Sequence, residues 1–333
     1  MKVSPCLNPD LFWALRGGGG GTFGVVTSVT IRTFEDAPMV FYSINVTIPF
    51  ASPNDSASAD ATLWELVAQW HSIAPAVNDI TGSAYYFILP RSPGMSAHVF
   101  ISVSMFPGHK DPGAAAKVLE PFITWANGQL GGPPFVNASV IPFPTVAAFL
   151  DGFIGQTQSG MGVNIIMGSR LVSREKLTMP EGVQEVATTL REINELGGTV
   201  QGLFVAGGKV AANKDIDSAL NPAWRKALTS IVITLEWEFT DSFEKIAELK
   251  KLMTEVLVPK LKKLDWDPVK NKQTMGAYVN EADKEDKDWQ DSYWGPNYDR
   301  LKKLKRKWDP KGVFWCRPCV GSEEWDLEGI CRV

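Results

Sequence analysis

The residues best suited to bind a ligand through their backbone are glycines near the N-terminus. Five consecutive glycines, Gly17–Gly21, are followed closely by Gly24. Glycine reaches positive φ without steric cost, so such a run can present main-chain N–H groups to an anion or to the heteroatoms of a ring. The spacing over residues 19–24 satisfies the dinucleotide fingerprint, but that fingerprint needs a helix after the glycines. Here the β-branched segment Val25–Ile31 predicts a strand, so we expect a ligand-binding loop or a packed turn rather than a nicotinamide site.

A tyrosine and an asparagine two positions apart form the best candidate for acid–base chemistry. They are Tyr278 and Asn280 in the run GAYVNEAD, and on a strand they would share one face. A phenol accepts a proton near neutral pH only if its neighbours lower its pKa from about 10, so Tyr278 is a candidate base that needs such help. The alternative is an aromatic residue that only packs beneath a cofactor. Glu281 and Asp283 could assist, but their position predicts solvated loop acids.

Two cysteines close to the C-terminus, Cys316 and Cys319, form a C-x-x-C motif. Such a motif can be half of a zinc site or a redox dithiol, but zinc requires two further ligands and no histidine lies nearby in the sequence. Cys331 is the only close third sulfur. We therefore predict a local disulfide, or two packed thiols, and no metal site.

The composition argues against two classes of partner. The chain has 333 residues, of which 44% are hydrophobic, and its 33 basic and 37 acidic side chains give a formal net charge of -4. That balance provides no cationic excess for a phosphate backbone, so nucleic-acid binding is not expected. A transmembrane helix is not expected either, because no stretch approaches the ~20 apolar residues that cross a bilayer. The 12 Trp and 17 Phe suggest wide flat surfaces, either core layers or the walls of a site for a ring-bearing ligand.

Signals for secretion conflict. Residues 1–16 lack the apolar block of a signal peptide. Sequons for N-glycosylation, which have meaning only in a secreted protein, begin at Asn45, Asn54 and Asn137. Patterns this short also arise by chance, so localisation is left open.

Residues 37–275 would position the chemical groups by alternating strand-like and helix-like segments. The side chains from Val40 to Ile48 alternate with a period of two, which predicts a half-buried strand with Asn45 facing outward. Further strands are predicted at 84–89, 99–105, 200–206 and 230–237. Apolar residues at helical spacing predict helices over 63–70, 115–126, 183–193 and 243–257. We therefore expect an α+β fold, in which an antiparallel sheet is covered by helices on one face and open to a ligand on the other.

Four motifs in order carry a resemblance that covers essentially the whole chain. They are DLFWALRGGGGGTFGVVTSVTIRTF, GAYVNEAD, GPNYDRLKKLKRKWDP and GVFWCRPCVGSEEW. With them the chain resembles the fungal FAD-linked oxidoreductases of the berberine-bridge-enzyme-like group, in the vanillyl-alcohol-oxidase superfamily. In that family a flavin domain of PCMH type is built from two separated stretches, with a substrate domain between them. The resemblance implies that residues 1–36 end the FAD-binding domain, residues 37–275 form the substrate domain, and residues 276–333 return to the FAD domain.

The resemblance also implies FAD as the cofactor and assigns residues to it. The backbone of the glycine loop is expected to lie against FAD at Gly21, Thr22, Gly24, Val25 and Val26. Tyr278 and Asn280 are expected to face the isoalloxazine or the substrate, and Asn297 the flavin side. The implied reaction is hydride transfer to the flavin from a C–H of an alcohol, an amine or a secondary metabolite. The aromatic content permits a small-molecule substrate that carries rings.

Members of this family, which are often secreted, carry a long further stretch before the segment with which this chain begins. That stretch holds the main pyrophosphate-binding loop and the His, or His and Cys, that attach the flavin covalently. His71, His98 and His109 lie in the substrate part and are predicted to be packing or surface residues. The chain is interpreted as truncated, with the other half supplied in cis or by another chain; a flavin-free binding module and a non-redox cyclase are the alternatives. An uncovered apolar surface is then predicted at Leu11, Phe12, Trp13, Val25, Val29, Val313, Phe314 and Trp315.

Overall fold

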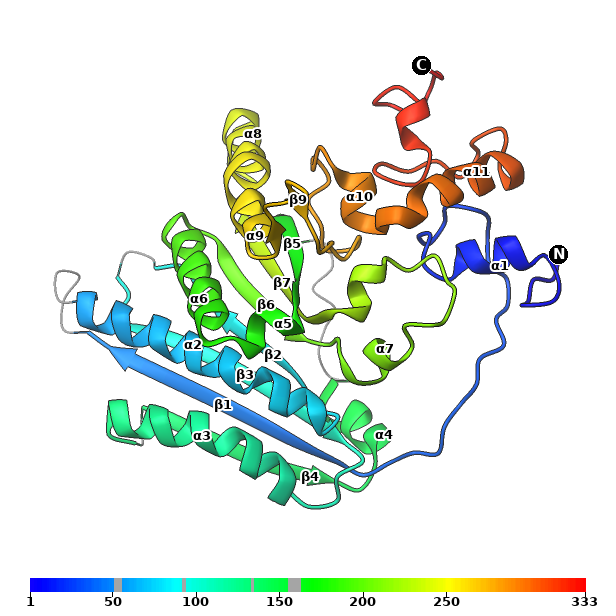
Figure 1. The fold of residues 1–333 in the computed structure, drawn as a ribbon. Helices are drawn as coiled ribbons and strands as arrows, with labels where there is room; N and C mark the ends of the chain where they lie inside the picture. The colour runs from blue at the N-terminus through cyan, green and yellow to red at the C-terminus, as the bar shows by residue number, and fades with distance from the viewer. Residues whose placement is uncertain (51–55, 92–93, 133–134, 155–162) are drawn as a thin grey trace.

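The fold is a sheet with helices packed on one face, as a computed structural model describes it for residues 1–50, 56–91, 94–132, 135–154 and 163–333 (Figure 1). The main sheet has seven strands in the order β4-β1-β3-β2-β6-β7-β5, and every pairing between neighbours is antiparallel. Its strands are β1 (Met39–Pro49), β2 (Ser83–Ile88), β3 (Ala97–Pro107), β4 (Val136–Phe143), β5 (Ile165–Ser173), β6 (Thr199–Phe204) and β7 (Ala227–Glu236). The predicted α+β class with an antiparallel sheet is thereby confirmed.

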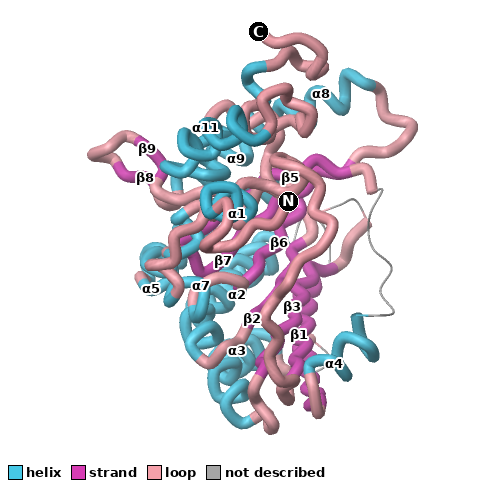
Figure 2. The backbone as a smooth tube through the Cα atoms, turned by 90° about the vertical axis from the view of Figure 1, so that its right-hand side faces the viewer, coloured by secondary structure: helices cyan, strands magenta, loops and turns pink. Residues whose placement is uncertain are grey.

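The helices divide between the sheet and the ends of the chain. They are α1 (Pro9–Leu15), α2 (Ser56–Asp79), α3 (Gly113–Leu130), α4 (Val146–Phe149), α5 (Arg174–Thr178), α6 (Pro180–Glu195), α7 (Gly208–Ala212), α8 (Phe243–Leu252), α9 (Val258–Lys263), α10 (Trp289–Trp294) and α11 (Tyr298–Trp308). Two short strands, β8 (Trp266–Asp267) and β9 (Lys272–Gln273), form a separate pair. Figure 2 shows α2 and α3 on one side of the main sheet. Their apolar stripes bury the large aromatic core, in which Trp70 stacks on Phe204 with ring centroids 5.7 Å apart.

The predicted strands and helices of the middle part are confirmed, although α2 (Ser56–Asp79) extends well beyond the predicted 63–70, and Asn45 is exposed. The last predicted helix begins at Phe243 and is capped by Ser242, whose hydroxyl accepts a hydrogen bond from the Lys245 N–H. It continues through a π-helical turn into α9. Phe243 was assigned to its apolar face, but this side chain is 88% exposed. Asn137 is exposed and lies opposite Asn45 in the β1–β4 register, whereas the sequon at Asn54 lies outside the described residues.

The three histidines are packing residues, as predicted. His71 is fully buried; its Nδ1 lies 2.8 Å from a main-chain carbonyl oxygen one turn earlier, and its Nε2 lies 2.8 Å from the Tyr86 hydroxyl. Burial lowers the pKa of His71 to about 4, because a charged imidazole would lose its hydration. His98 Nε2 lies 2.6 Å from a carboxylate oxygen of Asp60, and His109 Nε2 lies 2.9 Å from a main-chain carbonyl oxygen. Neither contact requires a cofactor.

The two ends of the chain meet in a second hydrophobic core, which we call the terminal cluster. Its buried members are Leu11, Trp13, Ala14, Phe23, Ala219, Ala277, Ala282, Tyr293, Trp294, Tyr298, Leu301, Leu304 and Val320. Figure 1 shows α1 beside the C-terminal helices. The Arg300 guanidinium lies 3.8 Å from the centre of a Trp13 ring, whose Nε1 donates to Asp217 at 2.6 Å.

The predicted uncovered surface is therefore wrong at Leu11 and Trp13, which α11 covers. It is confirmed at three other positions, because Val25, Val29 and Val313 are 78%, 74% and 71% exposed.

The predicted strand at Val25–Ile31 does not form within the described chain. The segment after Gly24 runs without helix or strand to the start of β1, and most of its side chains are exposed (Figure 1). A strand needs a neighbour to complete its ladder of hydrogen bonds. Among the described residues none pairs with this segment, so its β-branched sequence has no sheet to join.

Candidate functional site

The glycine loop contains glycines of two kinds. A Cβ on Gly17 would overlap the backbone of Leu220, and a Cβ on Gly18 would lie 2.6 Å from the Ala14 carbonyl oxygen. These two positions need glycine because they pack against main chain. By contrast, a Cβ on Gly20, Gly21 or Gly24 would meet no atom within 4 Å. The predicted ligand contacts at Gly21 and Gly24 therefore fall on the open side of the loop.

A buried lysine fixes the end of this loop to α11. The Lys305 ammonium donates to the carbonyl oxygen of Thr22 at 2.6 Å, to that of Phe314 at 2.6 Å and to a carboxylate oxygen of Asp309 at 2.7 Å. Burial alone would raise the pKa of Asp309, but hydrogen bonds from Lys305 and from two main-chain N–H groups lower it. The loop is thus held by a rigid part of the chain and does not depend on the exposed segment that follows.

The loop also has donors and acceptors that no described residue uses. The Oγ1 atom of Thr22 is buried without a hydrogen-bond partner. Within the described chain, the N–H groups of residues 19–34 take part in no recorded hydrogen bond. Val25 and Val26, the other predicted contacts, have exposed side chains. A ligand at this surface would meet unpaired main-chain donors and little side-chain obstruction.

Tyr278 and Asn280 lie on a turn and not on the strand that their spacing suggested. The Glu281 N–H donates to the Tyr278 carbonyl oxygen at 2.9 Å, which closes the turn. The turn is held to the sheet because the Leu171 N–H donates to the Gly276 carbonyl oxygen at 2.8 Å. It still brings the two side chains together, with Asn280 Nδ2 donating to the Tyr278 hydroxyl oxygen at 2.6 Å. We call residues 278–281 the tyrosine turn.

Two aromatic residues beside the tyrosine turn were not singled out from the sequence. The Trp224 ring stands edge-on to Tyr278, with centroids 5.8 Å apart, and packs against the small core that contains Leu171. The strand register places Leu171, Ser230, Leu203 and Tyr85 in one row across β5, β7, β6 and β2. Paired residues of adjacent antiparallel strands point to the same face. Tyr85 therefore lies on the face without the large helices, and its alternation with buried Tyr86 could have identified it.

The expectation of solvated acids at Glu281 and Asp283 is wrong. Asp283 is buried, and its carbonyl oxygen accepts a 2.6 Å hydrogen bond from the Tyr293 hydroxyl of α10. Glu281 is half-buried, and its Oε2 atom is fully buried without a partner. Burial raises the pKa of both carboxyl groups. These acids are withdrawn from solvent because α10 packs against both ends of the turn: the Ala277 N–H donates to the Ser292 carbonyl oxygen, and the Tyr293 hydroxyl donates to that of Asp283.

A buried ion cluster holds the tyrosine turn in place. Asp286 accepts hydrogen bonds from Arg170 Nη2 at 2.7 Å, from Lys262 Nζ at 2.6 Å and from the Ser292 hydroxyl at 2.7 Å. Burial raises the pKa of Asp286, but the charges of Arg170 and Lys262 and the hydrogen bonds outweigh it and leave that pKa lowered. These contacts join β5 and α9 to the segment between the tyrosine turn and α10.

Asn297 supports the glycine loop from behind. Its Nδ2 donates to the carbonyl oxygens of Ser218 and Leu220 at 3.3 and 2.9 Å, and Leu220 is the residue against which Gly17 packs. Its predicted contact with the flavin side stays a prediction.

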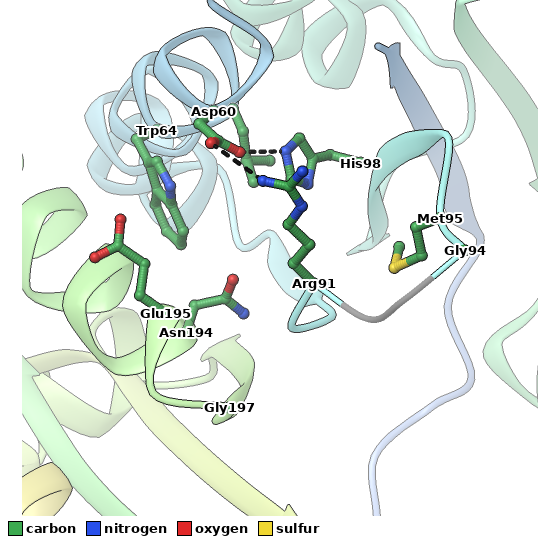
Figure 3. Close-up of a pocket in the computed structure, with 10 residues that line it drawn as sticks. Asp60, Trp64, Arg91, Gly94, Met95, His98, Asn194, Glu195 and Gly197 are labelled. Atoms are coloured by element: carbon green, nitrogen blue, oxygen red, sulfur yellow. Dashed lines mark hydrogen bonds and ion pairs between the residues drawn. The ribbon is translucent and has the colours of Figure 1, made fainter. Parts of the chain in front are cut away.

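Neither the C-x-x-C motif nor the pocket drawn in Figure 3 contributes a residue to the glycine loop or the tyrosine turn. Cys316 and Cys319 form a disulfide, which confirms the predicted local pairing. Over the described ranges, no group of three His, Cys, Asp or Glu residues is arranged to hold a metal. Figure 3 shows a pocket of about 460 Å³ in which Asp60 contacts both His98 and Arg91. Residues of α2, β3 and the end of α6 line it, and none comes from the glycine loop or the tyrosine turn.

The described part of the chain has no helix with the length and apolar character of a membrane span.

Comparison with known proteins defines the class. The structure superimposes on the VAO-type flavoprotein MtVAO713 of Myceliophthora thermophila with a TM-score of 0.79 and 26% identity, over 96% of this chain and 54% of that one. The fold is thus that of a VAO-type flavoprotein. The family pattern described as "Berberine and berberine like" matches residues 277–321, which include the tyrosine turn and α11. The chain is a berberine-bridge-enzyme-like member of the vanillyl-alcohol-oxidase flavoprotein superfamily.

Curated relatives agree with this assignment. An uncharacterized FAD-linked oxidoreductase of Arthroderma benhamiae is 38% identical over 98% of this chain and 53% of its own length. The flavin-dependent oxygenase ucdF of Aspergillus ustus is 32% identical over 100% of this chain and 58% of its own length. The chain therefore spans little more than half the length of the curated relatives it matches. FAD is the cofactor that this group of proteins uses.

The residues present fit one side of a flavin. The open faces of Gly20, Gly21 and Gly24 leave space against the backbone, and the orphaned Thr22 hydroxyl and unpaired N–H groups supply polar contacts. Lys305 and the packed glycines fix the position of that surface. The fit is a property of the loop backbone.

Proposed function

We propose that this chain supplies the substrate-binding part and one wall of the flavin site of an FAD-dependent oxidoreductase. The reaction is hydride transfer from a C–H of an alcohol, an amine or a secondary metabolite to the flavin. Residues 37–275 form the substrate domain, and residues 1–36 and 276–333 contribute to the flavin domain, whose remaining part comes from polypeptide outside this chain. The terminal cluster supports this division because it packs the first and last of these segments together.

One observation carries the proposal. The glycine loop and the tyrosine turn, which are far apart in sequence, belong to one packed body, because Phe23 and Ala277 are both buried in the terminal cluster. A surface of unpaired N–H groups and a tyrosine with an oriented hydroxyl are the two parts that a flavin oxidase needs from this half. Relatives named as an FAD-linked oxidoreductase and a flavin-dependent oxygenase support the same reading.

We assign the following roles to the residues. FAD, when bound, supplies the acceptor for the hydride. The N–H groups around Gly21, Thr22, Gly24, Val25 and Val26 bind the flavin. Tyr278 takes the proton from the substrate heteroatom, and Asn280 directs the Tyr278 oxygen by donating to it. The Trp224 ring restricts the movement of the Tyr278 ring.

Titration of the purified chain with FAD tests the proposal. FAD is added to the chain alone and to the chain mixed with the N-terminal half of the Arthroderma benhamiae relative, and binding is followed by equilibrium dialysis and the flavin absorption spectrum. Gly21→Val is the test variant, because it fills the open face of the loop at a φ of +70°. Gly128→Ala in α3, which also meets no atom within 4 Å, is the control.

We expect about one FAD per chain in the mixture, and at least tenfold weaker binding in Gly21→Val but not in Gly128→Ala. A chain that takes up no FAD in either setting would contradict the proposal and favour a flavin-free binding module or a non-redox cyclase.

A further inference from the structure

Glu281 carries a carboxyl group that the fold buries without neutralising it. Its Oε2 atom is out of contact with solvent and has no hydrogen-bond partner. Among the described residues, no lysine, arginine or histidine forms an ion pair with it. Arg170 and Lys262, the cations of the buried ion cluster, contact Asp286 and not Glu281. Burying a carboxylate without a partner is costly, so a partner from outside the chain would be strongly favoured.

The surroundings of this carboxyl are aromatic. Glu281 closes the tyrosine turn on the Tyr278 carbonyl, and the Tyr278 ring contacts Trp224. Burial raises the pKa of the Tyr85 phenol on β2, and the negative charge of Glu281 raises it further, so the two side chains lie near each other. Tyr85 and Leu171 lie in one row of the same sheet face, and Trp224 packs beside Leu171. Tyr85, Trp224 and Tyr278 come from three separate elements. Tyr85 lies close enough to Glu281 for its pKa to be affected by the Glu281 charge, Tyr278 belongs to the same turn as Glu281, and Trp224 contacts Tyr278.

We propose that Glu281 binds the ammonium group of a protonated amine whose aromatic part lies against Tyr85, Trp224 and Tyr278. A cation satisfies the unpaired carboxylate and is also attracted to the faces of aromatic rings, whereas a neutral hydroxyl gains only a hydrogen bond. An anionic substrate would be repelled. This inference rests on the proposed function, since it selects the amine from the substrates named there. Because Tyr278 borders the same place, the bound amine lies next to the proposed base.

Binding of phenethylamine and of 2-phenylethanol to the flavin-free chain at pH 8 tests this inference. The two probes have the same ring and differ in the ammonium group, and binding is followed by ligand-observed NMR. Glu281→Gln keeps the size of the side chain and removes its charge. Glu285→Gln is the matched control in the same loop, because Glu285 is exposed and its nearest cation is Arg317 at 3.7 Å.

We expect phenethylamine to bind at least tenfold more tightly than 2-phenylethanol, and Glu281→Gln to remove that difference while Glu285→Gln keeps it. Tyr85→Phe, which retains the ring, is expected to change the affinity for phenethylamine by less than twofold. Equal binding of the two probes to the unaltered chain, or an unchanged preference in Glu281→Gln, would overturn the inference. If Glu281→Gln does not fold, Glu281→Asp, which withdraws the carboxyl by one methylene, is expected to reduce the preference, and an undiminished preference would equally overturn it.

Failure of this inference and failure of the proposed function are separable. The probes are measured without FAD, and the FAD titration is made without an amine. Glu281-dependent binding of phenethylamine in a chain that never takes up FAD would leave the amine site standing and reject the oxidoreductase. FAD uptake without any preference for phenethylamine would support the proposed oxidoreductase and reject the amine site.

Discussion

Replacing Lys305 by methionine removes the ammonium that ties the glycine loop to α11 while keeping most of the apolar stem. In the native protein this ammonium satisfies two main-chain carbonyl oxygens and the buried carboxylate of Asp309. The variant leaves that carboxylate with its two main-chain donors but no positive charge. Breaking a buried ion pair from one side costs about 3–5 kcal/mol. We expect a loss near the lower end, about 3 kcal/mol, because the main-chain N–H groups still stabilise the anion.

Urea unfolding followed by tryptophan fluorescence measures this loss. Lys303→Met on the exposed side of α11 is the control, since Lys303 has no recorded partner and such surface changes stay within about 0.5 kcal/mol. Adding Asp309→Asn to Lys305→Met removes the stranded charge and is expected to restore about 1 kcal/mol or more. The reasoning is refuted if Lys305→Met is as stable as Lys303→Met. It is also refuted if Asp309→Asn lowers the free energy of unfolding of Lys305→Met by as much as it lowers that of the native chain.

Other contacts give further expectations. Gly18→Ala should lower the free energy of unfolding in urea by more than about 2 kcal/mol, because its Cβ would lie 2.6–2.8 Å from three atoms. Gly20→Ala, whose Cβ meets no atom within 4 Å, should change it by no more than about 0.5 kcal/mol. Equal losses in the two variants would contradict the division of the loop into packed and open glycines. Folding keeps His71 neutral down to about pH 4, while the unfolded chain binds a proton below about pH 6.5, so stability falls as the pH drops through this window. Relative to His71→Gln, the native chain should lose about 3 kcal/mol between pH 7 and pH 4, and parallel pH profiles of the two unfolding free energies would contradict this. Arg170→Met should cost about 3–5 kcal/mol by leaving Asp286 with Lys262 as its only cation; a urea midpoint unchanged from the native chain would show that the cluster does not hold the turn.

The sheet could be predicted from the sequence because its pattern is local. Period-two alternation identified β1, and helical spacing identified α2, α3 and α6, since each of these buries one face against a core inside the chain. The same reasoning failed at Val25–Ile31. β-branched residues favour an extended backbone, but a strand also needs a neighbouring strand to pair with, and the local sequence does not show whether one is present. Alternation was also of no help for β4, which exposes most of its residues.

The part of the candidate site that the sequence could indicate is the glycine loop, whose backbone we propose to bind the flavin. The glycine run predicts a stretch of backbone without side chains. In the structure some of these glycines pack against other main chain and others face open space. The environment of Glu281 could not be read from its neighbours in sequence, because the burial comes from α10 and the rings from Trp224 and Tyr85. Long-range packing of this kind leaves no local pattern.

The terminal cluster also sets an order of events during folding. α1 packs against α11, and Asp10 pairs with Lys307 at 2.6 Å. The first helix of the chain can therefore reach its native packing only after α11 has formed. Contacts between residues so far apart in sequence form late, because closing a long loop costs entropy before any contact rewards it. The strands of the main sheet and the helices that cover it precede α11 in the sequence, so they are synthesised before it. We therefore expect the glycine loop to take its shape only after the main sheet and its helices have folded.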